Sequence, residues 1–474
     1  MKKKAIISLL IHVVLCSGCL AQIKPQGMPV LEVTIPGIFT EDMDYVCGTM
    51  KLQDVDSSAV ILPAKFRTRG ATAREYMMKP SFNMKLRDAE NVEIDSMLLG
   101  LRSCSSWILD AMAIDRICMR NRVAFDIWNE FSRLPYKTDF DSRNGTVGKF
   151  VEVYINTEYK GIYCLSDRIN RKLLDLKKTK EGVEGPDTIR GVLYKHGTQN
   201  ISNQNEPCFS EDSATCVVEW HNAWELTYPD DHGGKEVWQP LIDAIANFED
   251  YDYVSEHCYL DNLADCALLV MALAIQDNWG NKNKYASIRN IQTDGNKARM
   301  VFTPWDLDTS LGGSYNGSRY DGTYTKWPLQ SMVGNAPAPL SICLTRQEFM
   351  ELMKSRWLET RDKAFSVESV KEKMYAYRDL FISSGAWERQ LSVVSELATQ
   401  VVTDLAREID LILEWYQNRH DEMDEFFGVD PSLVRSPQMP EKTSIDSNCY
   451  TLTGQRTTSV SRGIYIQNNR KYYK

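Results

Sequence analysis

The chain has 474 residues, a net charge of −9 and 43% hydrophobic residues, which are typical values for a globular protein of two or three lobes. An acidic chain without clustered Lys and Arg excludes nonspecific nucleic-acid binding, because a phosphate backbone demands concentrated positive charge. After the N-terminal segment, no stretch approaches the ~20 apolar residues that a spanning helix needs. We therefore expect no nucleic-acid partner and no membrane contact beyond a lipid anchor.

Residues 1–21 have the layout of a bacterial secretory signal peptide. Three lysines precede an apolar run, and small residues lead to Ala21. Cleavage after Ala21 would release a soluble protein, whereas Ser17-Gly18-Cys19 is similar to a lipobox and would place a lipid on Cys19. Both exits remain open. We expect an exported protein in the periplasm, at the cell surface or outside the cell.

Alternating apolar and polar residues predict a β-rich N-terminal region. An N-terminal β segment covers 22–60, and a lobe covers 61–175. Strands at 64–70 and 81–86 flank a polar turn, and 149–165 predicts a hairpin that turns at 156–158. Helical spacing of apolar residues predicts a helix over 114–131.

The second half of the chain is predicted to be mainly helical. Residues 176–235 read as an inserted polar segment with one short strand, and 236–427 as a helical lobe. A proline-containing linker follows at 428–447. The tail, 448–474, predicts a small β module and is similar to an ending common on exported Bacteroidetes proteins. The fold class is therefore α+β.

An apolar strand at 300–304 leads into two acids separated by one residue, Asp306 and Asp308. In extended backbone both carboxylates would lie on one face and reach one ion. Magnesium prefers a few such oxygen ligands. The alternative is that Asp308 caps a turn while Asp306 meets solvent.

A second acid, Asp277, follows the strongly apolar helix predicted at 263–275, and amides follow at Asn281 and Asn283. A catalytic Asp followed closely by a metal-holding Asn is the arrangement that kinases use. The alternative is a helix end with Asx turns.

A third signal is the polar turn that follows Arg69 and Gly70, with Lys79 and Lys85 on the return strand. A glycine turn and a lysine can cover and neutralise phosphates. The alternative is an exposed hairpin with solvated charges.

Several long motifs occur in an order that resembles the spore coat protein H (CotH) kinase family over roughly residues 60–425. The most specific are Pro304-Trp305-Asp306-Leu307-Asp308 and the hairpin Val151-Glu152-Val153-Tyr154 with its return strand. The further matching segments are 69–72, 79–86, 107–109, 115–121 and 356–361. The resemblance implies an atypical bilobal protein-kinase-like fold, with an N-terminal β-rich lobe and a C-terminal helical lobe. It also implies use of ATP and Mg2+ to phosphorylate a protein.

The resemblance also assigns roles by motif. Asp277 becomes the candidate base, and Asp306 with Asp308 the metal site. The remaining candidates are a second metal contact at Asn281 or Asn283, phosphate contacts at Arg69, Gly70 and Lys79 or Lys85, a partner for that lysine at Glu152, and adenine contacts at Leu165 and Asp167.

The sequence also departs from the family pattern. Position 282, five residues after Asp277, is Lys282 where a kinase loop has Asn, and Asp167 replaces the usual Glu. Two functions therefore remain open. One is Mg-ATP-dependent phosphoryl transfer to a protein hydroxyl at or outside the cell envelope. The other is a catalytically degenerate scaffold for surface assembly or binding, which the scarcity of ATP outside the cytoplasm favours. A metal-dependent hydrolase is a weaker third option.

Overall fold

The computed structural model describes residues 24–37, 39, 44–70, 79–138, 142–183, 185–196, 224–229, 235–275, 278, 284–292, 298–314, 329–394, 402–429, 449–451, 456–457, 464–467 and 470–473. Contacts divide the chain into a first unit, Met1–Met423, and a second unit, Asp424–Lys474. The candidates Asp277, Asn281 and Asn283 lie outside the described residues, as does the predicted signal peptide.

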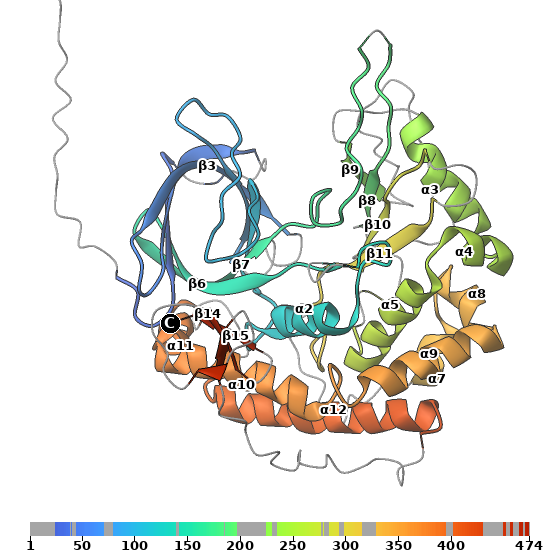
Figure 1. Ribbon diagram of the computed structural model, residues 1–474. Helices are drawn as coiled ribbons and strands as arrows, with labels where there is room; N and C mark the ends of the chain where they lie inside the picture. The colour runs from blue at the N-terminus through green and yellow to red at the C-terminus, as the bar shows by residue number, and fades with distance from the viewer. Residues whose placement is uncertain are drawn as a thin grey trace, which may run out of the picture. The chain divides into compact units, whose positions relative to one another are not determined.

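The N-terminal half of the first unit contains a closed barrel with the strand order β1-β2-β3-β4-β5-β7-β6 (Figure 1). Strand β1 closes it, because it pairs antiparallel with β2 and parallel with β6. The strands are β1 (Val30–Thr34), β2 (Val46–Gln53), β3 (Val60–Arg69), β4 (Ser81–Leu86), β5 (Ser106–Asp110), β6 (Gly148–Ile155) and β7 (Glu158–Asp167).

Side chains of alternate residues fill the barrel, as the two-residue period of a strand requires. Phe66, Phe82, Trp107, Tyr163 and Leu165 are among the buried residues of this core. The polar residues between them therefore point outward. The outer face of β3, β5 and β7 is the part of the barrel that takes part in the candidate site.

Helix α2 (Arg120–Phe131) begins six residues later than the sequence suggests. Met112 and Cys118 have positive φ angles of 49° and 55°, so the segment before Arg120 forms turns. The Asp115 carboxylate accepts hydrogen bonds from the backbone N–H groups of Met119 and Arg120, both at 2.7 Å. Asp115 thus satisfies donors that the start of a helix leaves open, and it fixes where α2 begins.

A second sheet in the first unit has the order β11-β10-β8-β9, with all neighbours antiparallel. Its strands are β8 (Val192–His196), β9 (Trp224–Tyr228), β10 (Lys284–Ile288) and β11 (Met300–Pro304). Two of them lie inside the predicted polar insertion. The insertion therefore supplies half of a sheet that the predicted helical lobe completes.

Helices make up most of the remaining described residues of the first unit, and with the barrel they confirm a mixed α+β fold. Helix α5 (Leu260–Leu273) packs against β11 and against α9 (Gln347–Thr360). The others are α3 (Lys235–Asn247), α4 (Tyr251–His257), α7 (Leu329–Gly334), α8 (Leu340–Leu344), α10 (Val367–Ser383), α11 (Ala386–Val394) and α12 (Leu405–Phe426). None of the helices in the described ranges is long and apolar enough to cross a bilayer.

Helix α11 ties the helical region to the barrel through β6 and β7. Arg389 donates two hydrogen bonds of 2.7 Å to the Glu152 carboxylate. The Gln390 side-chain oxygen accepts the Ile162 N–H at 2.7 Å. A Cβ on Gly161 would lie 2.2 Å from that oxygen, so only glycine allows this close approach.

The second unit is described by its own sheet, with the order β13-β12-β14-β15. Its strands lie where the sequence predicts a small β module, and all neighbours are antiparallel. They are β12 (Cys449–Thr451), β13 (Arg456–Thr457), β14 (Ile464–Gln467) and β15 (Arg470–Tyr473).

Candidate active site

The loop that follows β11 carries the two predicted metal ligands, but not in the predicted conformation. Asp306 has a φ of +59°, in the left-handed region, and Asp308 stands in a turn. The two carboxylates therefore do not share one face of an extended strand. Asp is one of the few residues that adopts left-handed backbone readily, which explains how the chain turns here. Both side chains remain partly exposed.

Helix α2 holds this loop in place through its first two residues. The Asn121 side chain donates to the Asp110 carboxylate at 2.7 Å and accepts the Leu307 N–H at 3.1 Å. Arg120 donates to the carbonyl of Leu311 at 3.3 Å. One amide thus connects barrel strand β5 to the backbone between the two acids.

Strand β3 brings a cation to the start of the same loop. The guanidinium of Arg69 lies 4.9 Å from the centre of the Trp305 ring, a cation–π contact. The next residue, Gly70, ends the strand with a φ of +93°, a conformation that favours glycine. The predicted pair Arg69–Gly70 is therefore brought beside the predicted Asp306.

Strand β8 supplies a second cation, Lys195. It pairs in register with Tyr285 on β10, and the Tyr285 ring meets the Trp305 ring edge-on at 5.9 Å. Burial lowers the pKa of Lys195, and the positive charge of Arg69 lowers it further, whereas the negative charge of Asp306 raises it. Lys195, Arg69 and Asp306 therefore lie close enough to act on one another electrostatically.

Arg168, which follows β7, is the third cation of this group. It also lowers the pKa of Lys195, and it hydrogen bonds the Tyr285 side chain. Glu225 on β9 lies 4.0 Å from the Lys195 ammonium and offsets part of the charge. Arg69 and Arg168 from the barrel thus lie near Lys195 of the second sheet, and Lys195 is within electrostatic reach of Asp306.

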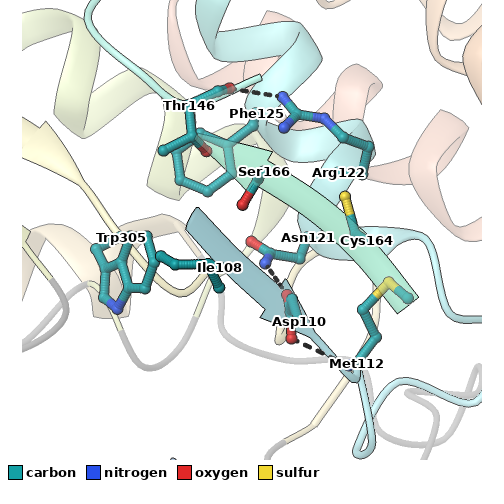
Figure 2. A pocket seen from close by; sticks show the side chains of 10 residues that line it. All are labelled: Ile108, Asp110, Met112, Asn121, Arg122, Phe125, Thr146, Cys164, Ser166 and Trp305. Carbon is teal, nitrogen blue, oxygen red and sulfur yellow. Dashed lines mark hydrogen bonds between the residues drawn. The ribbon is translucent and has the colours of Figure 1, made fainter. Parts of the chain in front are cut away.

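A pocket with an empty volume of about 320 Å3 lies next to this group, between the outer face of β5 and β7, helix α2 and Trp305 (Figure 2). Asp110, hydrogen bonded to Asn121, is one of its polar walls. The residues that line it are Ile108, Asp110, Met112, Asn121, Arg122, Phe125, Thr146, Cys164, Ser166 and Trp305.

The sequence suggests that Lys79 binds phosphates, whereas in the structure its side chain contacts other residues of the protein. Its side chain is buried, and the ammonium donates to the carbonyls of Ala111 at 3.1 Å and Ile162 at 2.8 Å. A longer bond of 3.4 Å reaches Gln390, and the ammonium lies 4.7 Å from the centre of the Tyr163 ring. Burial lowers its pKa. Lys79 therefore joins barrel and α11.

Glu152, predicted to pair with the lysine, is ion-paired with Arg389 and accepts the Tyr159 hydroxyl at 2.8 Å. The site loop contributes none of these contacts. Glu152 therefore belongs to the junction between the barrel and α11.

The other barrel candidates are also distributed around the barrel. Asp167 is fully buried and accepts hydrogen bonds from Arg102 at 3.0 Å and from the Val147 N–H at 2.9 Å. Leu165 belongs to the barrel core. Lys85 points outward and lies 5.2 Å from the centre of the Tyr45 ring.

Sequence reasoning missed Lys195, Arg168 and Asn121 as site residues. Arg168 and Asn121 stand inside motifs of the resemblance, so their position in those motifs was the available signal. Lys195 lies in a strand that was assigned to an insertion, and its pairing partner Tyr285 on β10 comes ninety residues later in the chain.

The barrel, the second sheet and the supporting helices define a mixed α+β protein, and cations lie near its aspartate loop. The chain matches the CotH kinase protein family over residues 66–423 and therefore belongs to that family. No curated protein matches the chain closely. In the described ranges, no three His, Cys, Asp or Glu side chains gather as a metal-binding group.

Proposed function

We propose that this protein is an atypical kinase that transfers the terminal phosphoryl group of ATP to a protein hydroxyl. The observation that carries the proposal is the convergence of Arg69 and Lys195 on the loop that contains Asp306, with Arg168 beside Lys195. Family membership supports the use of ATP. The barrel and the helical region would then act as the two lobes of a kinase-like protein.

The three cations would recognise the phosphates. A triphosphate carries several negative charges, and phosphoryl transfer is catalysed mainly by positioning and by charge neutralisation. Arg69 is held against Trp305, and Lys195 is held by its strand pairing with Tyr285. Because both side chains have fixed neighbours, they would need little rearrangement to bind the nucleotide.

The carboxylates of Asp306 and Asp308 fit magnesium, which binds hard oxygen ligands and keeps several of its waters. When bound, Mg2+ would neutralise phosphate charge. Asn121 would position the loop, since its amide fixes the Leu307 N–H between the two acids. Asp277 would orient the acceptor hydroxyl and accept its proton. The exported location would place the acceptor at or beyond the envelope.

The test is binding of ATP measured by titration calorimetry with and without Mg2+, followed by transfer of labelled phosphate. We expect Lys195→Met to weaken ATP binding about tenfold or more, since it removes a charge-assisted contact. Asp306→Asn should weaken the magnesium dependence. Lys149→Met on the exposed face of β6 is the matched control and should bind as wild type.

The proposal fails if folded wild-type protein shows no magnesium-dependent ATP binding. That result would favour the scaffold function. Binding without transfer to any protein would instead indicate a degenerate kinase.

A further inference from the structure

A second pocket lies on the opposite face of the four-stranded sheet from Trp305. Successive residues of a strand point to opposite faces, so Tyr285 meets Trp305 while Lys284 points toward α5. The pocket encloses about 520 Å3 of empty space, part of which is open to solvent. It is separate from the pocket beside Asp110, because the two have no lining residue in common.

The walls of this pocket are mostly apolar. Helix α5, strand β11 and the segment before α8 each contribute to them. The apolar lining residues are Leu263, Val270, Phe302, Pro304, Pro337, Ala338, Pro339 and Leu340. The polar lining residues are Lys284, Cys266, Asn278 and Thr303. Lys284 is the one cationic side chain among these twelve; burial lowers its pKa to about 8, so it is still mostly protonated at pH 7.

We propose that this pocket binds an amphiphilic carboxylate, a single apolar chain whose carboxylate head lies against Lys284. The apolar walls match the chain, because each buried methylene contributes favourable transfer energy. The head group meets a positive charge in a poorly solvated place, where a charge-assisted contact is strong. This site is independent of the phosphoryl-transfer proposal.

The composition of the walls also excludes other ligand classes. A nucleotide or sugar would bury many polar atoms for which the pocket has few donors and acceptors, at a cost for each. An amphiphilic cation would face the like charge of Lys284. A neutral apolar molecule would fit the walls but gain nothing from the lysine.

The pocket touches the backbone that leads to the aspartate loop. Pro304 lines it, and Asn278, also in its wall, donates to the Trp305 carbonyl at 2.6 Å. A bound chain would therefore lie within two residues of Asp306.

The experiment titrates the full-length folded protein with decanoate and, separately, with decanol, which has the same chain and no charge. We expect decanoate to bind about tenfold or more tightly than decanol. Lys284→Met should remove this preference while decanol binding stays within twofold. Lys195→Met, a lysine removed from the other face of the same sheet, is the matched control and should leave decanoate binding unchanged.

A second variant keeps the lysine and fills the pocket. Val270→Trp places a large ring in the wall on α5 and should abolish binding of both ligands. Thermal melts of each variant establish that it is folded. The inference is overturned if wild-type protein does not bind decanoate, if decanol binds equally well, or if Val270→Trp binds decanoate normally. Because none of these readouts uses ATP, failure of the kinase proposal would not change them.

Discussion

Replacing Lys79 by Met separates two roles that the sequence cannot distinguish. The substitution keeps the length of the side chain and removes the ammonium. It deletes the hydrogen bonds to Ala111, Ile162 and Gln390 that join barrel and α11. The variant should therefore lose stability, while its folded form still binds nucleotide.

The magnitude follows from those contacts. Three hydrogen bonds at about 1 kcal/mol each give about 3 kcal/mol. Part of this is offset, because the variant no longer buries a charge that burial itself disfavours. We expect a net loss of about 2 kcal/mol, which lowers the Tm of a large domain by about 4 °C.

The assay pairs a thermal melt with ATP titration below the transition. We expect the Kd for Mg-ATP of Lys79→Met to lie within twofold of wild type. Lys195→Met should show the mirror pattern, with a nearly unchanged Tm and weakened ATP binding. Loss of ATP binding by Lys79→Met at an unchanged Tm would refute this reasoning and would indicate that Lys79 binds the phosphates.

Three further predictions concern other parts of the first unit. Burial lowers the pKa of His196 to about 3, so the unfolded chain takes up a proton near pH 6.5 and the folded protein does not. The contribution of His196 to the free energy of unfolding should therefore be fully present above pH 6.5 and fall by about 1.4 kcal/mol per pH unit as the pH drops toward 3. The free energy of unfolding in urea should differ less between pH 7.5 and pH 5.0 for His196→Phe than for wild type. Arg389→Met leaves the Glu152 carboxylate buried without its cation, and chemical denaturation should show a loss of about 2–3 kcal/mol, with Glu152→Gln in the same protein restoring part of it. Asn121→Ala frees the loop between the two acids, so the Mg2+ concentration needed for half-maximal ATP binding should rise several-fold; an unchanged value would exclude a positioning role.

The positions of the barrel strands were largely predictable from the sequence, but which strands pair with one another was not. Alternation at 149–165 predicted the β6–β7 hairpin because the two strands are joined by a short turn. Nothing local in Val30–Thr34 indicates that it pairs parallel with β6, more than a hundred residues away. Likewise β8 looked isolated, since β10, its partner on one side, comes much later.

The same distinction applies to the candidate site residues. Asp306 was a candidate because a strand end and two acids are adjacent in sequence. The left-handed backbone of Asp306 was not predicted, because that turn depends on Asn121 and Arg120, which hold the loop from another element. Lys79 was assigned to phosphate because its partner Gln390 could not be recognised from the local sequence, since it lies 311 positions further along the chain.

The closure of the barrel bears on where the protein can be shortened. The family match begins at residue 66, but β1 and β2 lie before it, and β3 begins at Val60. A chain starting at residue 66 would leave β6 and β3 with open edges and unpaired backbone groups, which invite association with other chains. Soluble expression of the matched region therefore requires a start upstream of Val30, so the first strand of the barrel is as much a part of the folded unit as the segments that match the family.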